Sequence, residues 1–230
     1  MRLDKYLATY AGLSRKEAKA AVKSGRVQVD GRTAEKFDEK IQKNAVVYLN
    51  QKLIVVEEHI YLMLNKPAGV VSATRDDRER TVVDLVDCAG RELFPVGRLD
   101  KDAEGLLLLT DDGALAHRLL SPKYHVKKCY YVRYEGVLSE DAAELFRQGV
   151  DIGEKKHTLP AELEILGGGQ AKLTISEGKF HQVKRMIAKV GGRVTALKRL
   201  TMGNLVLDDN LAPGEYRRLT KAEIDDLAGQ

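Results

Sequence analysis

The sequence predicts an α+β protein with a small N-terminal α/β domain and a larger domain built on a mostly antiparallel, mixed β-sheet flanked by helices. Three observations support this class. Two short helical segments precede a strong hairpin signal, Asp30-Gly31. A run of four leucines indicates a strand buried on both faces. The remaining strand-like segments have flanks too varied for a repeated βαβ pattern. We expect domains over residues 1–59 and 60–230.

The first domain is expected to fold as two helices followed by a hairpin. Apolar residues recur at helical spacing over 3–11, and a glycine follows. Ser14–Glu17 has the form of a capping box, so a helix should run from Arg15 to about Ser24. The chain then alternates around the Asp30-Gly31 turn, and residues 45–49 read as a closing strand.

The second domain mixes both kinds of element. Helices are expected over 114–120, 141–150 and 182–190, with a helix start at 80–86, and strands over 61–64, 106–110, 128–138 and 171–176. Pro95 and Gly97 argue against a helix before the leucine run.

Basic residues are concentrated in two parts of a chain whose net charge is only +4. Residues 1–52 hold 12 Lys or Arg against six acids, and residues 172–199 hold eight against one. Two basic concentrations on a near-neutral chain favour a polyanionic ligand over ordinary solubilising charge.

Cysteine usage and hydropathy argue against several classes of protein. Cys88 and Cys129 form no C-x-x-C pattern, which argues against a zinc site or a disulfide framework. The N-terminal segment has no long apolar region, and no apolar run approaches the length of a membrane span. We expect a soluble, cytoplasmic protein that does not associate with membranes.

The segment GRLDKDAEGLLLLTDDG, residues 97–113, admits two interpretations. Its acids imitate the spacing of a calcium loop, but such a loop needs a helix on both sides, and two of its ligand positions would fall among leucines. Alternatively Asp100, before a buried strand, is a catalytic carboxylate on a rigid element rather than a turn residue. The other acids, Asp102, Glu104, Asp111 and Asp112, are then expected to be solvated turn residues.

The first domain resembles a known RNA-binding fold. RLDKYLATYAGLSRKEAKAAVKSGRVQVDGR is similar to the small domain shared by a small-subunit ribosomal protein, tyrosyl-tRNA synthetases and several RNA-modifying enzymes. Three lysines of the predicted helix fall on one side at i, i+3 and i+7, where they could meet phosphates or simply form a solvated basic face. The resemblance favours RNA contacts by Arg15, Lys16, Lys19, Lys23 and Arg26.

The second domain resembles the pseudouridine synthases. GRLDKDAEGLLLLTDDG, LNKPAG, KKCYYV and ISEGKFHQVKRM occur in the family's order and spacing. The match is best to the branch that modifies ribosomal RNA, and within it to enzymes that make one pseudouridine, at position 516, in 16S rRNA. One departure is Ala103-Glu104, where many members carry Ser or Thr before the acidic-or-small position. This weakens any role for a hydroxyl there but leaves Asp100 in place.

The resemblance implies an isomerase that breaks the N1–C1′ bond, turns the uracil and joins C5 to C1′. Such a reaction needs no cofactor or metal, but the base must leave its stack. Asp100 is then the essential carboxylate, as a nucleophile or as a stabiliser that also removes a sugar proton. Lys184 would keep Asp100 ionised. Tyr130 would stack on the base, with Tyr131 as the alternative because neighbouring strand residues face opposite ways.

Further residues are implied to contact RNA. Arg98 would hold the flipped nucleotide or a phosphate, unless it is a structural arginine, and Lys179, His181 and Arg185 are plausible contacts. The expected partner is 16S rRNA in an assembling small subunit, bound by a monomer. A synthase acting on 23S rRNA or tRNA and a non-catalytic assembly factor are the alternatives.

Overall fold

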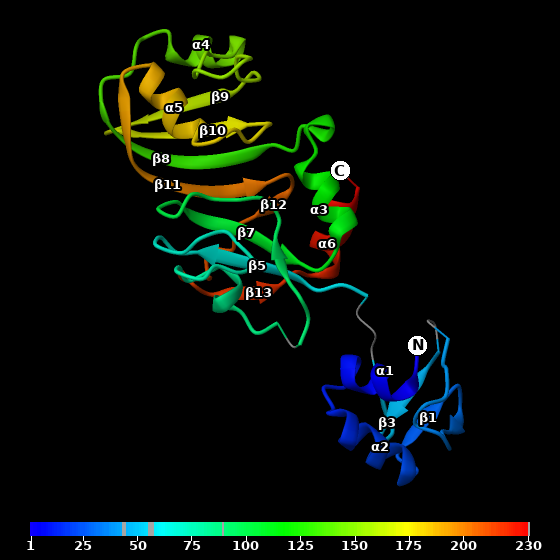
Figure 1. Ribbon diagram of the computed structural model, residues 1–230. Coiled ribbons are helices and arrows are strands. Elements are labelled where there is room, and N and C mark those ends of the chain that lie inside the picture. Colours follow the sequence, from blue (N-terminus) through cyan, green and yellow to red (C-terminus); the bar gives the residue numbers. More distant parts are fainter. Residues whose placement is uncertain (43–44, 55–57, 89, 230) are drawn as a thin grey trace. The chain divides into compact units, whose positions relative to one another are not determined.

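A computed structural model describes residues 1–42, 45–54, 58–88 and 90–229 (Figure 1). The chain divides into two compact units. The first unit comprises Met1–Glu58 with Cys88–Arg91, and the second comprises His59–Asp87 with Glu92–Gln230. The short segment Cys88–Arg91 gave no sign in the sequence of belonging with the N-terminal unit. The assignment of domains to 1–59 and 60–230 stays a prediction.

The first unit contains the predicted helices and hairpin. Ser14 Oγ accepts from the backbone N–H of Glu17, and Glu17 Oε2 accepts from that of Ser14, which confirms the capping box. Asp30 and Gly31 have φ values of 49° and 82°, as a tight hairpin turn requires. The elements are α1 (Leu3–Tyr10), α2 (Arg15–Lys23), β1 (Val27–Val29), β2 (Arg32–Thr33), β3 (Val47–Leu49) and β4 (Lys52–Leu53), with strand order β2-β1-β3-β4.

The second unit is built on a nine-stranded sheet with a main strand order of β13-β5-β7-β11-β8-β10-β9. Its pairings are antiparallel except for the parallel pair β7 and β11, so the predicted α+β class with a mixed sheet is confirmed. The strands are β5 (Tyr61–Lys66), β6 (Phe94–Pro95), β7 (Glu104–Thr110), β8 (Lys128–Gly136), β9 (Glu162–Gly167), β10 (Gln170–Ile175), β11 (Gly192–Met202), β12 (Leu205–Val206) and β13 (Tyr216–Arg218).

In the described part of this unit, four α-helices accompany the sheet: α3 (Gly113–Leu120), α4 (Ala142–Gln148), α5 (Gln182–Lys189) and α6 (Lys221–Ala228). The first three match predicted helices. Helix α6 was missed, although Thr220 and Glu223 form a second capping box that was visible in the sequence. The helix start expected at 80–86 is wrong, because that segment forms only a 3₁₀ turn, Val83–Leu85, whose Asp84 side chain binds Thr81. None of the helices in the described ranges is long and apolar enough to cross a membrane.

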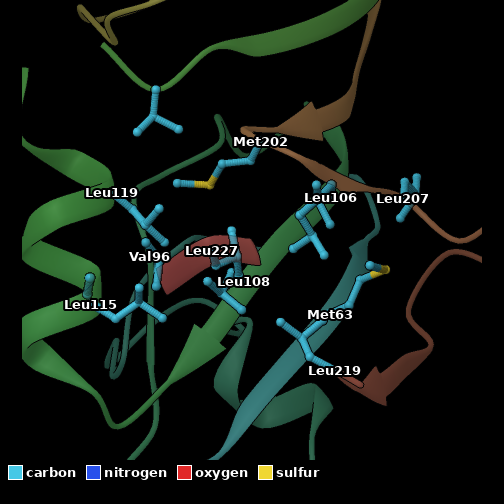
Figure 2. Packing of buried hydrophobic residues seen from close by; sticks show 13 residues of the cluster. Met63, Val96, Leu106, Leu108, Leu115, Leu119, Met202, Leu207, Leu219 and Leu227 are labelled. Carbon is cyan, nitrogen blue, oxygen red and sulfur yellow. The ribbon is translucent and has the colours of Figure 1, made fainter. Parts of the chain in front are cut away.

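Strand β7 is buried on both faces, as its leucine run predicted. All four leucines have no exposed surface. Leu106 and Leu108 belong to a cluster that includes Leu115 and Leu119 of α3 and Leu227 of α6 (Figure 2). Each fully buried leucine contributes about 1.5–3 kcal/mol. The strand therefore gives a rigid anchor to the loop that precedes it.

Candidate active site

The loop that carries Asp100 is pinned on both sides of that residue. Ser72 Oγ accepts from the backbone N–H of Leu99 at 3.0 Å and donates to the Leu99 carbonyl oxygen at 2.9 Å. The ammonium of Lys66 donates to the carbonyl oxygens of Lys101 and Ala103 at 3.2 and 2.7 Å. The backbone on either side of Asp100 is thus hydrogen-bonded to fixed side chains, which limits where its carboxylate can point.

Lys66 supports the Asp100 loop, and the sequence analysis did not single it out. Its side chain is fully buried at the end of β5, and a third bond goes to the Pro67 carbonyl oxygen at 3.0 Å. Burial lowers the pKa of Lys66 to about 8, and the nearby carboxylates of Asp102, Glu104 and Asp100 oppose this only in part. The LNKPAG segment contained the residue, but nothing local showed where its ammonium would go.

Asp100 and Lys184 form the ion pair that the sequence predicted. Lys184 Nζ lies 2.9 Å from Asp100 Oδ2 and 2.7 Å from Asp102 Oδ1. Helix α5 orients this lysine because Val183 and Met186 are buried in the unit, which leaves Lys184 toward the Asp100 loop. The ammonium therefore links both carboxylates to the helix.

The pKa values of Lys184 and Asp102 follow from the contacts of these two side chains. Burial lowers the pKa of Lys184, but the hydrogen bonds to Asp102 and Asp100 outweigh it, and the net pKa is raised. The hydrogen bond from Lys184 is also the main reason that the pKa of Asp102 is lowered. Lys184 thus stays a cation at neutral pH, and it favours the ionised form of Asp102.

The acids of residues 97–113 have different roles. The expectation of a solvated turn residue is confirmed for Asp102, but it is wrong for Glu104, which begins β7, and for Asp111 and Asp112, which are half-buried. Asp102 binds Lys184 even though its side chain is 73% exposed. Asp111 and Asp112 lie at the far end of β7. Asp111 accepts from the backbone N–H of Ile60, and Asp112 caps α3 and accepts from the Tyr61 hydroxyl. These carboxylates stabilise local structure rather than converge on one ligand.

Tyr130 is on the cavity side of β8, as expected. It is 6% exposed and, with Asp100, lines a small cavity of about 80 Å³, between strands that pair it with Leu173 and Arg199. Tyr131 is not among the lining residues, and its hydroxyl donates to the side-chain amide oxygen of Gln170. The alternation of side chains along the strand therefore places Tyr130, not Tyr131, beside the carboxylate.

A second aromatic side chain stands at this site without having been predicted. Phe180 is 69% exposed and its ring stacks on His181, with centroids 3.8 Å apart. His181 in turn has Nε2 at 3.6 Å from Asp100 Oδ1, and its backbone is left-handed with φ of 49°. An exposed aromatic ring beside the Asp100 carboxylate is suited to stacking on a nucleobase.

A cavity of about 910 Å³ opens beside Asp100 and is lined by residues of the second unit alone. Arg98 is exposed along it and makes no hydrogen bond or ion pair to any residue in the described ranges, so it is free to meet a ligand. Lys179 and Arg185, unlike Arg98, form hydrogen bonds with other residues. Lys179 Nζ donates to the carbonyl oxygens of Lys156 and His157, and Arg185 binds Glu154 and nearby carbonyl oxygens. Their role as RNA contacts stays a prediction.

The basic residues of the first unit are exposed. Arg15, Lys16, Lys19 and Lys23 lie on α2, and Arg26 follows it. The Lys19 ammonium lies 4.6 Å from the centroid of the Phe37 ring, and Arg26 Nε donates to Ser24 Oγ. Because the buried face of α2 consists of Ala18, Ala21 and Val22, its lysines are left available to a polyanion.

Both units of the chain are similar to known protein families. A family model described as RNA pseudouridylate synthase matches residues 60–189, and an S4 domain model matches residues 1–47. An uncharacterized RNA pseudouridine synthase of Bacillus subtilis is 50% identical over 97% of both chains. The ribosomal small subunit pseudouridine synthase A of Escherichia coli K12 is 44% identical over 97% of this chain and 98% of its own.

A solved structure gives the same result at the level of the fold. A crystal structure of a pseudouridylate synthase superposes with a TM-score of 0.70 at 42% identity and covers 99% of each chain. The matched family model and these full-length relatives together cover both the Asp100 loop and the basic N-terminal helix. The chain therefore belongs to the RNA pseudouridylate synthase family, as a pseudouridine synthase with an N-terminal S4 domain.

Proposed function

We propose that this pseudouridine synthase isomerises one uridine of 16S rRNA, equivalent to position 516, and that it acts as a cytoplasmic monomer on an assembling small subunit. The observation that carries the chemistry is the ion pair between Asp100 and Lys184, 2.9 Å apart at the edge of a cavity that Tyr130 also lines. The names of the relatives support the ribosomal small subunit as the source of the RNA.

Asp100 is the proposed catalytic carboxylate. Cleavage of the N1–C1′ bond leaves positive charge at C1′, and an ionised carboxylate can either bond to C1′ or stabilise that charge and take a sugar proton. Lys184 pairs with the carboxylate at 2.9 Å, and the bonds from Ser72 and Lys66 hold its loop in place. Tyr130 provides an aromatic face for the uracil while the base turns to present C5.

The test is turnover by Asp100→Asn, with Asp102→Asn as the matched control. Both carboxylates contact the Lys184 ammonium, but only Asp100 lines the cavity. Tritium release from C5-labelled uridine in small-subunit particles measures turnover, and the modified site is mapped in parallel. We expect Asp100→Asn to bind RNA without releasing tritium, whereas Asp102→Asn keeps most of its activity.

The same assay separates the proposed substrate from its alternatives. Tritium release from 23S rRNA or tRNA, with none from small-subunit particles or naked 16S rRNA, would replace the substrate and keep the chemistry. Measurable product from pure Asp100→Asn would remove Asp100 from its proposed role. Binding without release from any RNA by the wild type would favour a non-catalytic assembly factor.

A further inference from the structure

The large cavity beside Asp100 contains a buried arginine whose guanidinium is only partly paired. Arg199 lies on β11, is 2% exposed, and lines this cavity. Its Nε donates to the Leu106 carbonyl oxygen at 2.8 Å, while its Nη2 is buried and has no hydrogen-bond partner among the described residues. A buried charged donor without an acceptor costs free energy, so its retention calls for a partner.

A second cation lines the same cavity. Lys128 begins β8, and its Nζ donates to the Val126 carbonyl oxygen at 2.7 Å. Burial and, to a smaller extent, the positive charge of Arg199 lower the pKa of Lys128 to about 8. Two like charges that affect each other in a partly closed space repel, unless an anion comes between them.

The carboxylates of the cavity do not neutralise this pair. Asp100 is bound by Lys184, and Glu177 accepts from the Leu159 backbone N–H and the Gln182 side chain. Within the described part of the chain, neither Arg199 nor Lys128 has a carboxylate within ion-pair distance. The protein thus leaves two cations available beside the reactive carboxylate.

We infer that Arg199 and Lys128 form an anion subsite that takes a phosphodiester of the RNA next to the uridine that enters the cavity. A guanidinium offers paired donors that match phosphate oxygens, and an ammonium adds a compact charge. The uracil ring is neutral and would not compensate two buried cations, whereas each nucleotide brings one phosphate. The inference rests on the proposed function only in taking RNA as the ligand.

The test is a charge-by-charge comparison of RNA binding, made in the Asp100→Asn background so that no turnover intervenes. The probe is a short RNA carrying the uridine that the wild type converts, with one linkage at a time replaced by a neutral methylphosphonate. Lys128→Met removes one cation and keeps an apolar side chain of similar length. Arg193→Gln is the matched control, since Arg193 lies on the same strand as Arg199, is 75% exposed and pairs with Glu135.

We expect one linkage beside the target uridine to weaken binding by about tenfold when it is neutral, in the parent and in Arg193→Gln, as the loss of a charge-assisted bond predicts. In Lys128→Met the same replacement should weaken binding clearly less than it does in the parent, because only Arg199 is left to contact that phosphate. Arg199→Gln should show the same reduced effect of the neutral linkage, provided that circular dichroism shows this variant to be folded. If it is not folded, the result for Lys128→Met alone tests the subsite.

Two results would overturn the subsite. One is Lys128→Met binding the unmodified RNA as tightly as Arg193→Gln does. The other is an equal loss at every linkage in the parent and in Lys128→Met. The experiment also distinguishes a wrong subsite from a wrong substrate. The probe is taken from whichever RNA the wild type converts, so an error in the 16S assignment does not remove the expected effect of the neutral linkage. A wild type that converts 23S rRNA and still shows the coupled linkage refutes the 16S assignment and supports the subsite.

Discussion

Replacing Lys66 with methionine tests quantitatively how the Asp100 loop is held. The ammonium is fully buried, and its pKa is about 8 in the folded protein against an ordinary value of 10.5. At 1.36 kcal/mol for each pKa unit, protonated Lys66 costs the folded state roughly 3 kcal/mol. Methionine has a similar length and no charge, so Lys66→Met does not carry this cost.

The pH dependence follows from the direction of this difference. Between pH 8 and 10.5 the unfolded chain binds more protons at Lys66 than the folded chain does, so wild-type stability rises with pH across this window. The cost is about 3 kcal/mol at pH 7.5 and roughly 1.4 kcal/mol at pH 9.5. We therefore expect the wild type to gain about 2 kcal/mol relative to Lys66→Met between these two conditions.

Urea unfolding of both proteins at the two pH values, followed by circular dichroism, measures this difference. Titrations common to both proteins cancel, including that of Lys128, whose pKa is also lowered to about 8. The steady cost of losing the bonds to the Lys101 and Ala103 carbonyl oxygens cancels as well. A stability difference that does not change with pH would refute the reasoning. Turnover should fall in Lys66→Met because the Asp100 loop is released on one side.

Three further predictions concern Lys184, Gly105 and the basic helix α2. Lys184→Met should reduce tritium release far more than RNA affinity, since Lys184 holds Asp100, and equal losses would make it a phosphate contact instead. Gly105→Ala should lower the free energy of unfolding by at least about 3 kcal/mol. Gly105 has φ of 98°, and an added Cβ would lie 2.3 Å from the Arg199 carbonyl oxygen. In the control Gly113→Ala the Cβ meets nothing, and a similar loss there would contradict this steric account. Replacing Lys16, Lys19 and Lys23 together with glutamine should weaken RNA binding and flatten its salt dependence by up to about three units of slope; an unchanged slope would remove α2 from the RNA interface.

Local signals in the sequence were sufficient to predict many of the helices, strands and turns. The capping box at Ser14 and the Asp30-Gly31 turn act through neighbouring backbone groups, so their geometry follows from a few adjacent residues. The leucine run of β7 could only be buried, whichever strands flank it. The same kind of signal, Thr220 followed by Glu223, caps α6, so local sequence is also sufficient to predict that helix.

The pairing of strands that lie far apart in the sequence could not be predicted from such local signals. Strand β11 has mixed burial along its length and pairs with β8 and β7, which come earlier in the chain. Its partners decide which of its side chains are buried, and so no short window of sequence predicts the burial of Arg199. The acids of residues 97–113 show the same limit, because Asp111 and Asp102 acquire their partners from Ile60 and Lys184.

The sequence by itself determined the family, the α+β class and the expected pair of Asp100 and Lys184, because the resemblance of its motifs implies the family and the pair, and local periodicity indicates the class. The tertiary structure alone decided which charges are buried and what they contact. It put the Lys66 ammonium under the Asp100 loop and left Arg199 partly unpaired in the cavity. The physical reason is that the cost of a buried charge depends on groups brought together from distant parts of the chain, and only folding brings them together.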